Sequence, residues 1–336
     1  MMHRIILFLL RLFQFLLFRM LFSLNDASTL RLVQIALAED IGTGDATAES
    51  IFDDNDYAVA EIIVKAEGII CGLPIAELVF RKVSRRIDFQ SLVTDGTEVV
   101  AGTAVACLSG VAADILAGER TALNFLQRMS GVATLTRRYA DAVAGTGTTV
   151  LDTRKTIPGW RLLDKYAVKT GGGSNHRFGL FDMAMIKDNH IAAAGGIAPA
   201  LEKCKNHLSG RNISIEIETD GLDQIREALA CGGFQRIMFD NFTPQETAEA
   251  VRLVGGRCET ESSGGITLDN IRHYAETGVN FISVGALTHS ATALDISLDM
   301  RLQPRAQSPL THIGPLYSTE SEIAPSWEIE RKPRRK

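Results

Sequence analysis

Apolar positions follow one spacing in the first part of the chain and another in the rest, which predicts two folded regions. Before residue 112, short runs of alternating apolar and polar residues are separated by Gly-containing turns and by stretches with helical spacing. This mixture predicts a small α+β domain, sandwich-like, at residues 25–130. Its expected strands cover 58–66 and 98–108, and its expected helices cover 28–39, 75–83 and 112–130.

After a further expected helix at 133–143, short β-branched runs alternate with helical stretches. Alternation of this kind is typical of parallel strands joined by helices. It suits an open or incomplete α/β barrel, assigned to residues 131–303, better than a doubly wound sheet with its glycine fingerprint. The expected strands are 148–152, 183–186, 213–217, 236–239, 257–260 and 281–284, and the expected helices are 160–169, 197–207, 222–231, 244–254 and 268–277.

Residues 1–24 are strongly apolar and carry three arginines and no acidic residue. A membrane-spanning helix needs about 20 mostly apolar residues, but Arg11 would then cost about 2.5 to 3.5 kcal/mol in the bilayer. A secretory signal fits less well, because the uninterrupted apolar run at 5–10 is short and no small-residue cleavage site follows it. An in-plane membrane helix with a basic stripe and a true start at Met20 both stay open. We expect a chain that begins at Met20 to be soluble and fully active.

The other end of the chain is rich in proline. Five of the nine prolines lie within residues 304–336, which close on a run of basic residues. Proline at this density opposes helix and sheet pairing, so the sequence predicts a flexible tail. A solvated tail explains the basic run better than contact with nucleic acid or anionic lipid.

Composition and charge narrow the class of protein. The chain has 336 residues, of which 46% are hydrophobic and 22% charged, as in ordinary globular proteins. Its formal net charge of -5 gives no reason to expect nucleic-acid binding, and leaving out the three arginines of residues 1–24 makes it more negative. The five cysteines form no Cys-x-x-Cys pair, which argues against a zinc site and fits single thiols in a reducing compartment. We therefore expect a cytoplasmic protein without membrane or nucleic-acid partners.

Charged side chains follow several of the expected strands of the barrel. In such barrels the chemistry lies where strands end and loops begin, so these side chains are expected to converge. Arginine grips a carboxylate in bidentate fashion and lysine adds a point charge, so together they suit an anion with more than one negative group. The cationic candidates are Arg154, Lys155, His176, Arg177 and Lys187.

Carboxylates and glycines follow the other strands. Glu216 and Asp240 are hard oxygen ligands of the kind that Mg²⁺ prefers. Gly264 and Gly265 precede an expected helix near residue 267, where free main-chain N–H groups would stabilise a phosphate. The combination predicts group transfer between a phosphorylated, metal-bound substrate and a carboxylated partner.

Several longer motifs resemble those of the quinolinate phosphoribosyltransferases, the nicotinate-nucleotide pyrophosphorylases (carboxylating) of NAD biosynthesis. The resemblance covers roughly residues 30–300. Its motifs are Glu-Asp-Ile-Gly-Thr-Gly-Asp at 39–45, Glu-Arg-Thr-Ala-Leu-Asn at 119–124, Asp-Thr-Arg-Lys-Thr at 152–156, Asn-His-Arg at 175–177, Lys-Asp-Asn-His at 187–190, Ser-Gly-Gly at 263–265 and Ser-Val-Gly-Ala-Leu-Thr-His at 283–289.

The resemblance implies a glycosyltransferase that moves phosphoribosyl from phosphoribosyl diphosphate to quinolinate, releasing diphosphate and CO₂ and forming nicotinate mononucleotide. It also implies Mg²⁺, a type II phosphoribosyltransferase barrel and a head-to-tail homodimer in which Arg120 reaches the partner subunit's site. By motif, the quinolinate carboxylates would be held by Arg120, Arg154, Lys155, His176, Arg177 and Lys187, and Thr153 would also bind substrate. The Mg²⁺-complexed donor would be held by Glu216 and Asp240, and its 5′-phosphate by Ser263, Gly264, Gly265, Gly285, Ala286 and Leu287.

Among these, Lys155, Lys187, Glu216 and Asp240 are expected to act in catalysis. Departure of diphosphate builds oxocarbenium character, which Mg²⁺ and nearby carboxylates would stabilise. Loss of the 2-carboxylate then leaves a carbanion beside the pyridinium nitrogen, and Lys155 with Lys187 would stabilise that charge.

Two other interpretations compete with this one. A relative from the molybdate locus is expected to differ at 175–177 and 187–190, where this chain reads like the quinolinate enzyme. A catalytically silent, membrane-attached phosphate binder would account for residues 1–24, but no candidate site position is lost.

Overall fold

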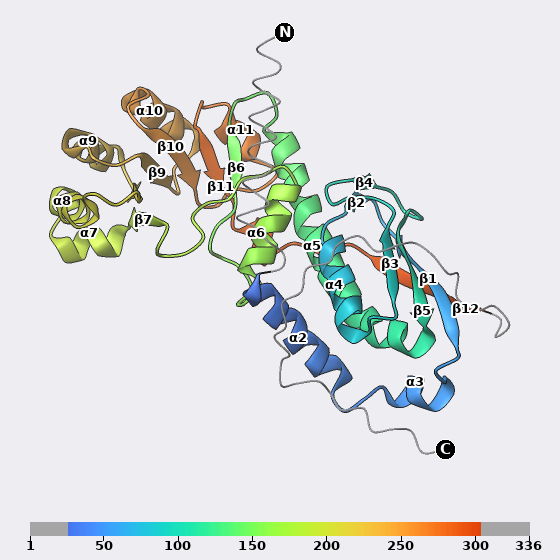
Figure 1. Ribbon diagram of the computed structural model, residues 1–336. Coiled ribbons are helices and arrows are strands. Elements are labelled where there is room, and N and C mark those ends of the chain that lie inside the picture. Colours follow the sequence, from blue (N-terminus) through green and yellow to red (C-terminus); the bar gives the residue numbers. More distant parts are fainter. Residues whose placement is uncertain (1–25, 304–336) are drawn as a thin grey trace, which may run out of the picture. The chain divides into compact units, whose positions relative to one another are not determined.

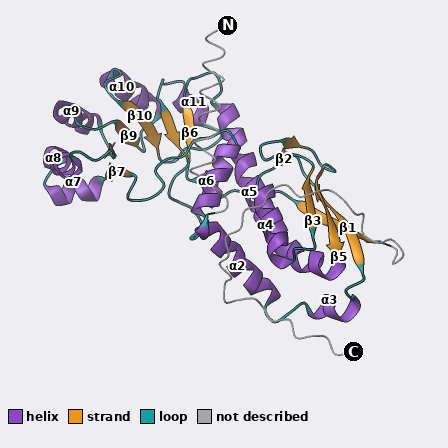
Figure 2. Cartoon of the chain, in the orientation of Figure 1, coloured by secondary structure: helices purple, strands orange, loops and turns teal. Residues whose placement is uncertain are grey.

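The computed structural model describes residues 26–303 (Figures 1 and 2). The predictions for residues 1–24 and for the proline-rich tail lie outside the described residues. Among the helices of residues 26–303, none is long and apolar enough to cross a membrane.

The first sheet is antiparallel and has the order β12-β1-β5-β3. In β1 every second residue is buried, from Ala58 to Val64, so that one face of the strand packs on the core. The bounds are β1 Tyr57–Val64, β3 Asp88–Ser91, β5 Ala104–Val111 and β12 Ile296–Leu302, and a separate two-stranded ribbon pairs β2 Gly68–Ile69 with β4 Glu98–Val99. The helices of this region are α2 Ala27–Ile41, α3 Ala46–Ile51 and α4 Leu73–Val83.

The strand β12 was not expected from the sequence. It comes last among the described elements but pairs antiparallel with β1, where Ile62 lies opposite Leu298. The chain therefore returns from the parallel sheet to complete the first one. The predicted domain boundaries, residues 25–130 and 131–303, stay predictions.

One continuous helix, α5 Ala112–Ala142, replaces the two helices expected at 112–130 and 133–143. Gly131 lies inside this helix, where another main chain approaches closely: a Cβ there would meet the carbonyl oxygen of Thr292 at 2.1 Å. The helix contacts β1, β2, β5 and β12 on one side of the fold and β6 and α6 on the other (Figure 1).

The second sheet is parallel, with the order β6-β11-β10-β9-β8-β7. Its edge strands β6 and β7 are not paired with each other, so the expected open barrel is confirmed. The strands are β6 Thr149–Leu151, β7 Met183–Ile186, β8 Ser214–Thr219, β9 Arg236–Asp240, β10 Glu259–Ser263 and β11 Phe281–Ser283. The helices are α6 Arg161–Thr170, α7 Asp188–Ala194, α8 Ile197–Leu208, α9 Leu222–Cys231, α10 Pro244–Val254, α11 Ile271–Ala275 and α12 Ala286–His289.

Several element bounds differ from the sequence prediction, and the strand expected at 98–108 divides into β4 and β5. Two of the differences have a clear cause. β10 starts two residues later than expected, because Arg257 caps α10 by donating from its side chain to the carbonyls of Leu253 and Val254. Helix α11 starts at Ile271 and not near residue 267, because Asn270 accepts the Thr267 amide and holds that segment as a turn. Gly264 and Gly265 thus precede a turn rather than a helix.

Candidate active site at the strand ends

Two arginines predicted to bind an anion lie close to each other. Arg154 follows β6 and is exposed, whereas Arg177 lies in the loop before β7 and is half-buried. Burial and the positive charge of Arg154 lower the pKa of Arg177. The Arg177 guanidinium donates to the carbonyl oxygen of Met183 at 3.1 Å, which anchors it beside β7. Two like charges held together favour binding of an anion.

Lys155 lies on the loop after β6 and packs against the loop after the neighbouring strand β11. A Cβ on Gly285 would lie 2.9 Å from Lys155 Cδ, so glycine leaves room for the lysine side chain. The Lys155 amide donates to the hydroxyl of Thr153 at 3.0 Å, and its carbonyl accepts from the hydroxyl of Thr288 at 2.8 Å. Ala286 and Leu287 begin the short helix α12, and the side chain of Leu287 is fully buried. Leu287 as a whole, main chain included, is therefore covered by the protein.

Lys187 follows β7 and pairs with Glu218 of β8. Its amide donates to Nδ1 of His190 at 3.0 Å, which fixes the start of α7. Glu218 follows Glu216 at an interval of two residues, so both side chains lie on the same face of β8. The sequence prediction gave Glu218 no role. The interval of two residues from Glu216, which puts both side chains on one strand face, was the signal that pointed to it.

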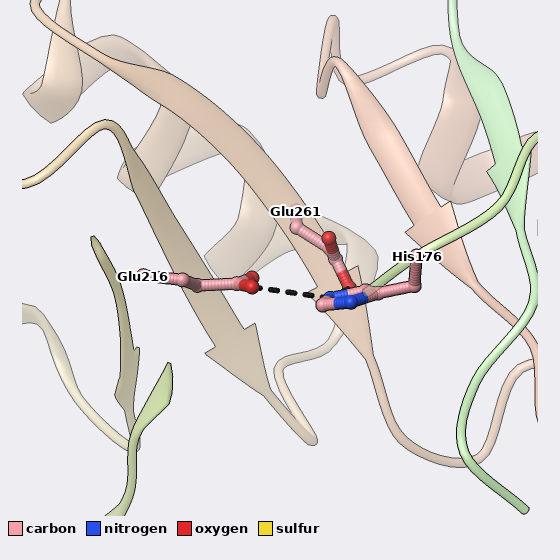
Figure 3. Close-up of side chains that lie close together, drawn as sticks. All are labelled: His176, Glu216 and Glu261. Carbon is pink, nitrogen blue, oxygen red and sulfur yellow. Dashed lines mark ion pairs between the residues drawn. The ribbon is translucent and has the colours of Figure 1, made fainter. Parts of the chain in front are cut away.

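His176 lies deeper, between two buried carboxylates (Figure 3). Its Nε2 is 3.1 Å from Glu216 Oε2 and 3.4 Å from Glu261 Oε1, and the side chains of both glutamates are fully buried. Its Nδ1 accepts the Arg177 amide at 2.7 Å. The main chain thus engages Nδ1, whereas Nε2 has no hydrogen-bond partner among the described residues. The role of His176 as a quinolinate ligand stays a prediction. Glu261 lies two residues before Ser263 and was also missed from the sequence.

Asp240 and Ser263 are register partners at the ends of β9 and β10. Asp240 accepts from the Asn241 side chain at 2.8 Å, and the Asn241 amide donates to the Ser263 carbonyl at 2.8 Å. Gly264 has a φ of +95°, and a Cβ there would meet Asn241 Oδ1 at 2.1 Å, so only glycine suits this position. Gly265 follows and is exposed. These residues form one compact turn at the carboxyl edge of the sheet.

The two carboxylates predicted to share Mg²⁺ lie at different depths. Glu216 is in register with Arg236, and Asp240 lies four residues further along β9, which is about 13 Å at the usual rise of a strand. Glu218 is in register with Met238, only about 7 Å before Asp240. Glu216 thus lies further from Asp240 along the sheet than Glu218 does, and its role as a Mg²⁺ ligand stays a prediction. Glu218 and Asp240 are both partly exposed and offer the hard oxygen ligands that such a site needs.

Arg120 is not among the residues at the strand ends. It lies on α5, its side chain is 59% exposed, and its guanidinium is 4.0 Å from Glu119. Within residues 26–303 of one chain, no ion pair joins Arg120 to the other candidate residues.

Comparison with known proteins gives consistent matches over both regions. Residues 45–130 match the model of the quinolinate phosphoribosyl transferase N-terminal domain, and residues 132–299 match that of the C-terminal domain. A Bacillus subtilis protein named probable nicotinate-nucleotide pyrophosphorylase (carboxylating) is 44% identical over 279 residues, covering 83% of this chain and 96% of that protein. The chloroplastic nicotinate-nucleotide pyrophosphorylase (carboxylating) of Arabidopsis thaliana is 44% identical over 79% of this chain and 80% of its own length.

The solved structures agree with the sequence relatives. The nicotinate-nucleotide pyrophosphorylase of Francisella tularensis superposes with a TM-score of 0.79 at 42% identity, covering 82% of this chain and 98% of that one. The family expected from the motifs is thereby confirmed. This chain belongs to the quinolinate phosphoribosyl transferase family.

Proposed function

We propose that this protein transfers phosphoribosyl from phosphoribosyl diphosphate to quinolinate with loss of CO₂, forming nicotinate mononucleotide for NAD biosynthesis. The observation that carries this proposal is the placement of Arg154, Lys155 and Lys187 on loops at the carboxyl edge of one parallel sheet, with Arg177 next to Arg154. The names of the relatives described above support the same reaction.

Quinolinate carries two adjacent carboxylates, and the arginines suit them. Arg154 and Arg177 lie near each other and can each bind a carboxylate in bidentate fashion. Lys187 is compact and charged, and its pairing with Glu218 holds it beside the same loop edge in the absence of substrate. A monocarboxylate would leave part of this positive charge uncompensated, so the site favours a dicarboxylate.

Phosphoribosyl diphosphate would lie on the neighbouring half of the edge. Its 5′-phosphate suits the turns at Ser263, Gly264 and Gly265 and at Gly285, where the main chain is open to a ligand. We propose that Mg²⁺ enters bound to the diphosphate, held by Asp240 and Glu218 and not by Glu216. The ion would neutralise the leaving diphosphate.

The chain's own residues account for the later steps. The pyridine nitrogen attacks the anomeric carbon as the bond to diphosphate breaks, and the ring becomes cationic. The C2–carboxylate bond then breaks, CO₂ leaves, and its electron pair stays on C2 until a proton adds. Lys155 carries a fixed ammonium on the loop that packs against Gly285, where it stabilises this developing negative charge.

We further propose a cytoplasmic homodimer in which Arg120 completes the site of the partner subunit. The exposed guanidinium on α5 supports this, as do the exposed side chains of Leu180 and Phe181 beside the Arg177 loop. The five cysteines are free, as is usual for a reducing cytoplasm.

The test of the activity is direct. Purified protein incubated with quinolinate, phosphoribosyl diphosphate and Mg²⁺ is expected to release CO₂ and form nicotinate mononucleotide in equal amounts. Nicotinate in place of quinolinate is expected to give no mononucleotide, because it lacks the second carboxylate. Absence of product from quinolinate would refute the proposal.

The dimer has its own test. Arg120→Ala and Lys155→Ala are each expected to be nearly inactive, but mixing the two after subunit exchange restores activity, because one site in the hybrid keeps both residues. No recovery in a mixture proven to contain hybrid dimers would place Arg120 outside the partner's site.

A further inference from the structure

Arg154 and Arg177 occupy equivalent positions in two segments that start side by side. Leu151, the last residue of β6, forms a parallel bridge with Ser174. The Ser174 carbonyl also accepts the amide of Asp152 at 3.1 Å. Three residues after Leu151 lies Arg154, and three residues after Ser174 lies Arg177. Contacts that join the two segments beyond the bridge therefore set the separation of the two arginines.

A buried ion pair joins the two segments at their base. Lys165 of α6 pairs with Asp152, and both side chains are fully buried. The Lys165 ammonium also donates to the main-chain carbonyl of His176 at 3.0 Å, and the Asp152 carboxylate accepts the His176 amide at 2.9 Å. The same pair thus holds the residue directly before Arg177 and the residue two places before Arg154.

Arg161, at the start of α6, joins the two segments a second time. Its Nε donates to the hydroxyl of Thr156 at 3.1 Å, and its Nη1 donates to the carbonyl of Phe178 at 3.1 Å. Its Nη2 lies 3.5 Å from the carbonyl oxygen of Arg154. Thr156 comes two residues after Arg154, and Phe178 directly follows Arg177. Arg161 and the buried ion pair therefore hold each segment on opposite sides of its arginine.

Helix α6 is itself fixed in place, which gives Arg161 a rigid base. Trp160, the residue before the helix, stacks on Phe125 of α5 with ring centroids 4.8 Å apart. Asp164 of α6 is buried and lies 3.1 Å from the guanidinium of Arg128 of α5. A guanidinium presents its N–H donors in a rigid planar fork, whereas an ammonium is a point charge on a flexible stem. Arg161 therefore holds its acceptors in fixed positions relative to α6.

We propose that Arg161 is a positioning residue that sets the separation of Arg154 and Arg177, so that together they bind the two adjacent carboxylates of quinolinate. The use of quinolinate rests on the function proposed above, whereas the joining of the two segments by Arg161 does not. Arg161 acts through the hydroxyl and the main-chain carbonyls that it holds. A lysine at this position would keep the positive charge but lose the fork, so charge and geometry can be separated.

The binding test compares a dicarboxylate with a monocarboxylate. Arg161→Lys is expected to raise the Kd of quinolinate about tenfold or more, because the two arginines no longer match both carboxylates. The Kd of nicotinate, which needs only one of the arginines, is expected to rise no more than about twofold. Isothermal titration calorimetry measures both constants. Equal factors for the two compounds, or an unchanged Kd of quinolinate, would overturn the proposal.

A second arginine of the chain provides the matched control. Arg272 of α11 also donates from its guanidinium to a main-chain carbonyl, that of Ala144 at 2.9 Å. Ala144 lies before β6, at the opposite end of that strand from Arg154. Arg272→Lys is therefore expected to change the Kd of neither compound. An effect on quinolinate equal to that of Arg161→Lys would show a general response to the loss of an arginine and would overturn the proposal.

Hydrogen exchange tests the joining of the segments without any substrate. Mass spectrometry is expected to show faster amide exchange at 153–157 and 177–182 in Arg161→Lys than in the unchanged protein, and equal exchange at 263–267. Equal rates at the first two segments would overturn the proposal. Thr156→Val removes one acceptor of Arg161 and is expected to act in the same direction, which keeps the test available if Arg161→Lys does not fold. If the unchanged protein does not bind quinolinate, the proposed function fails, while the exchange rates still judge the joining.

Discussion

The hydroxyl of Thr288 donates a hydrogen bond of 2.8 Å to the main-chain carbonyl of Lys155. Thr288 is fully buried, and its own carbonyl accepts from Arg128, whose guanidinium is also 3.1 Å from Asp164. Arg128 lies on α5 and Asp164 on α6. The loop that carries Lys155 is thus tied through Thr288 to two helices behind the sheet.

Removing the Thr288 hydroxyl is expected to make the Lys155 loop more mobile without leaving a cavity in the core. Thr288→Val keeps the side-chain volume, and we expect kcat to fall about tenfold while the free energy of unfolding falls by about 1 kcal/mol. Thr288→Ser keeps the hydroxyl and serves as the control, with kcat within about threefold of the unchanged protein. Steady-state rates and urea denaturation measure both quantities. Equal kcat values for Thr288→Val and the unchanged protein would show that the bond does not position Lys155.

Replacement of Lys155 separates catalysis from binding. Because its ammonium is proposed to stabilise the carbanion formed after CO₂ leaves, Lys155→Ala is expected to lower kcat about 100-fold or more. The measurement is the rate of CO₂ release at saturating quinolinate. A near-normal kcat with only a raised KM would make Lys155 a binding group.

The dependence of the rate on Mg²⁺ concentration distinguishes the carboxylates of Glu216, Glu218 and Asp240. Asp240→Asn and Glu218→Gln are each expected to raise the Mg²⁺ concentration at half-maximal rate about tenfold, because each removes a candidate ligand. Glu216→Gln is the matched comparison from the same face of β8 and is expected to leave that concentration unchanged. If only Glu216→Gln raises the Mg²⁺ concentration at half-maximal rate, the ion binds at Glu216 and not at Glu218 and Asp240.

The raised pKa of Glu216 predicts how stability depends on pH. Burial and the charge of Glu261 raise this pKa above its ordinary value of 4.5, so the folded protein keeps a proton that the unfolded chain releases. The contribution of Glu216 therefore makes the free energy of unfolding fall as the pH rises from 4.5 through the pKa in the folded state. Glu216→Gln is expected to lack this part of the slope. Urea denaturation of both proteins at several pH values from about 5 to 8 measures the difference, and parallel curves would contradict it.

Gly131 tests the close approach of two main chains. Gly131→Ala brings a Cβ to 2.1 Å from the Thr292 carbonyl oxygen, so α5 and the segment before β12 must move apart. We expect a loss of about 1 to 3 kcal/mol in the free energy of unfolding, despite the higher helix propensity of alanine. Asn124→Ala, at an exposed position of the same helix, is expected to change stability by no more than about 0.5 kcal/mol. Thermal denaturation compares the stabilities of the two variants. If Gly131→Ala leaves the free energy of unfolding unchanged, α5 and the segment before β12 can move apart without cost.

Local patterns were enough to predict the parallel sheet and the clustering of charge at its edge. β-branched runs such as 213–217 and the helical stretches between them repeat at a spacing that is typical of strand-and-helix units. Since parallel strands bring their carboxyl ends to one edge, strand direction alone predicts that the polar residues after each run lie together. The family motifs added the substrates, which spacing alone does not specify.

Only the tertiary structure shows how deeply each carboxylate is buried and which distant strands pair. Glu216 and Glu218 have the same side-chain chemistry and lie on the same strand face, but only the strand register shows that Glu216 lies beneath His176 and Glu218 beside Lys187. The pairing of β12 with β1 joins segments more than 230 residues apart, which no local pattern encodes. The sequence by itself determined the strands and most helices of the parallel sheet and which charges gather at its edge, because periodicity and strand direction are local. Tertiary packing decided which of those charges face a ligand and which are buried, because burial depends on contacts between distant segments.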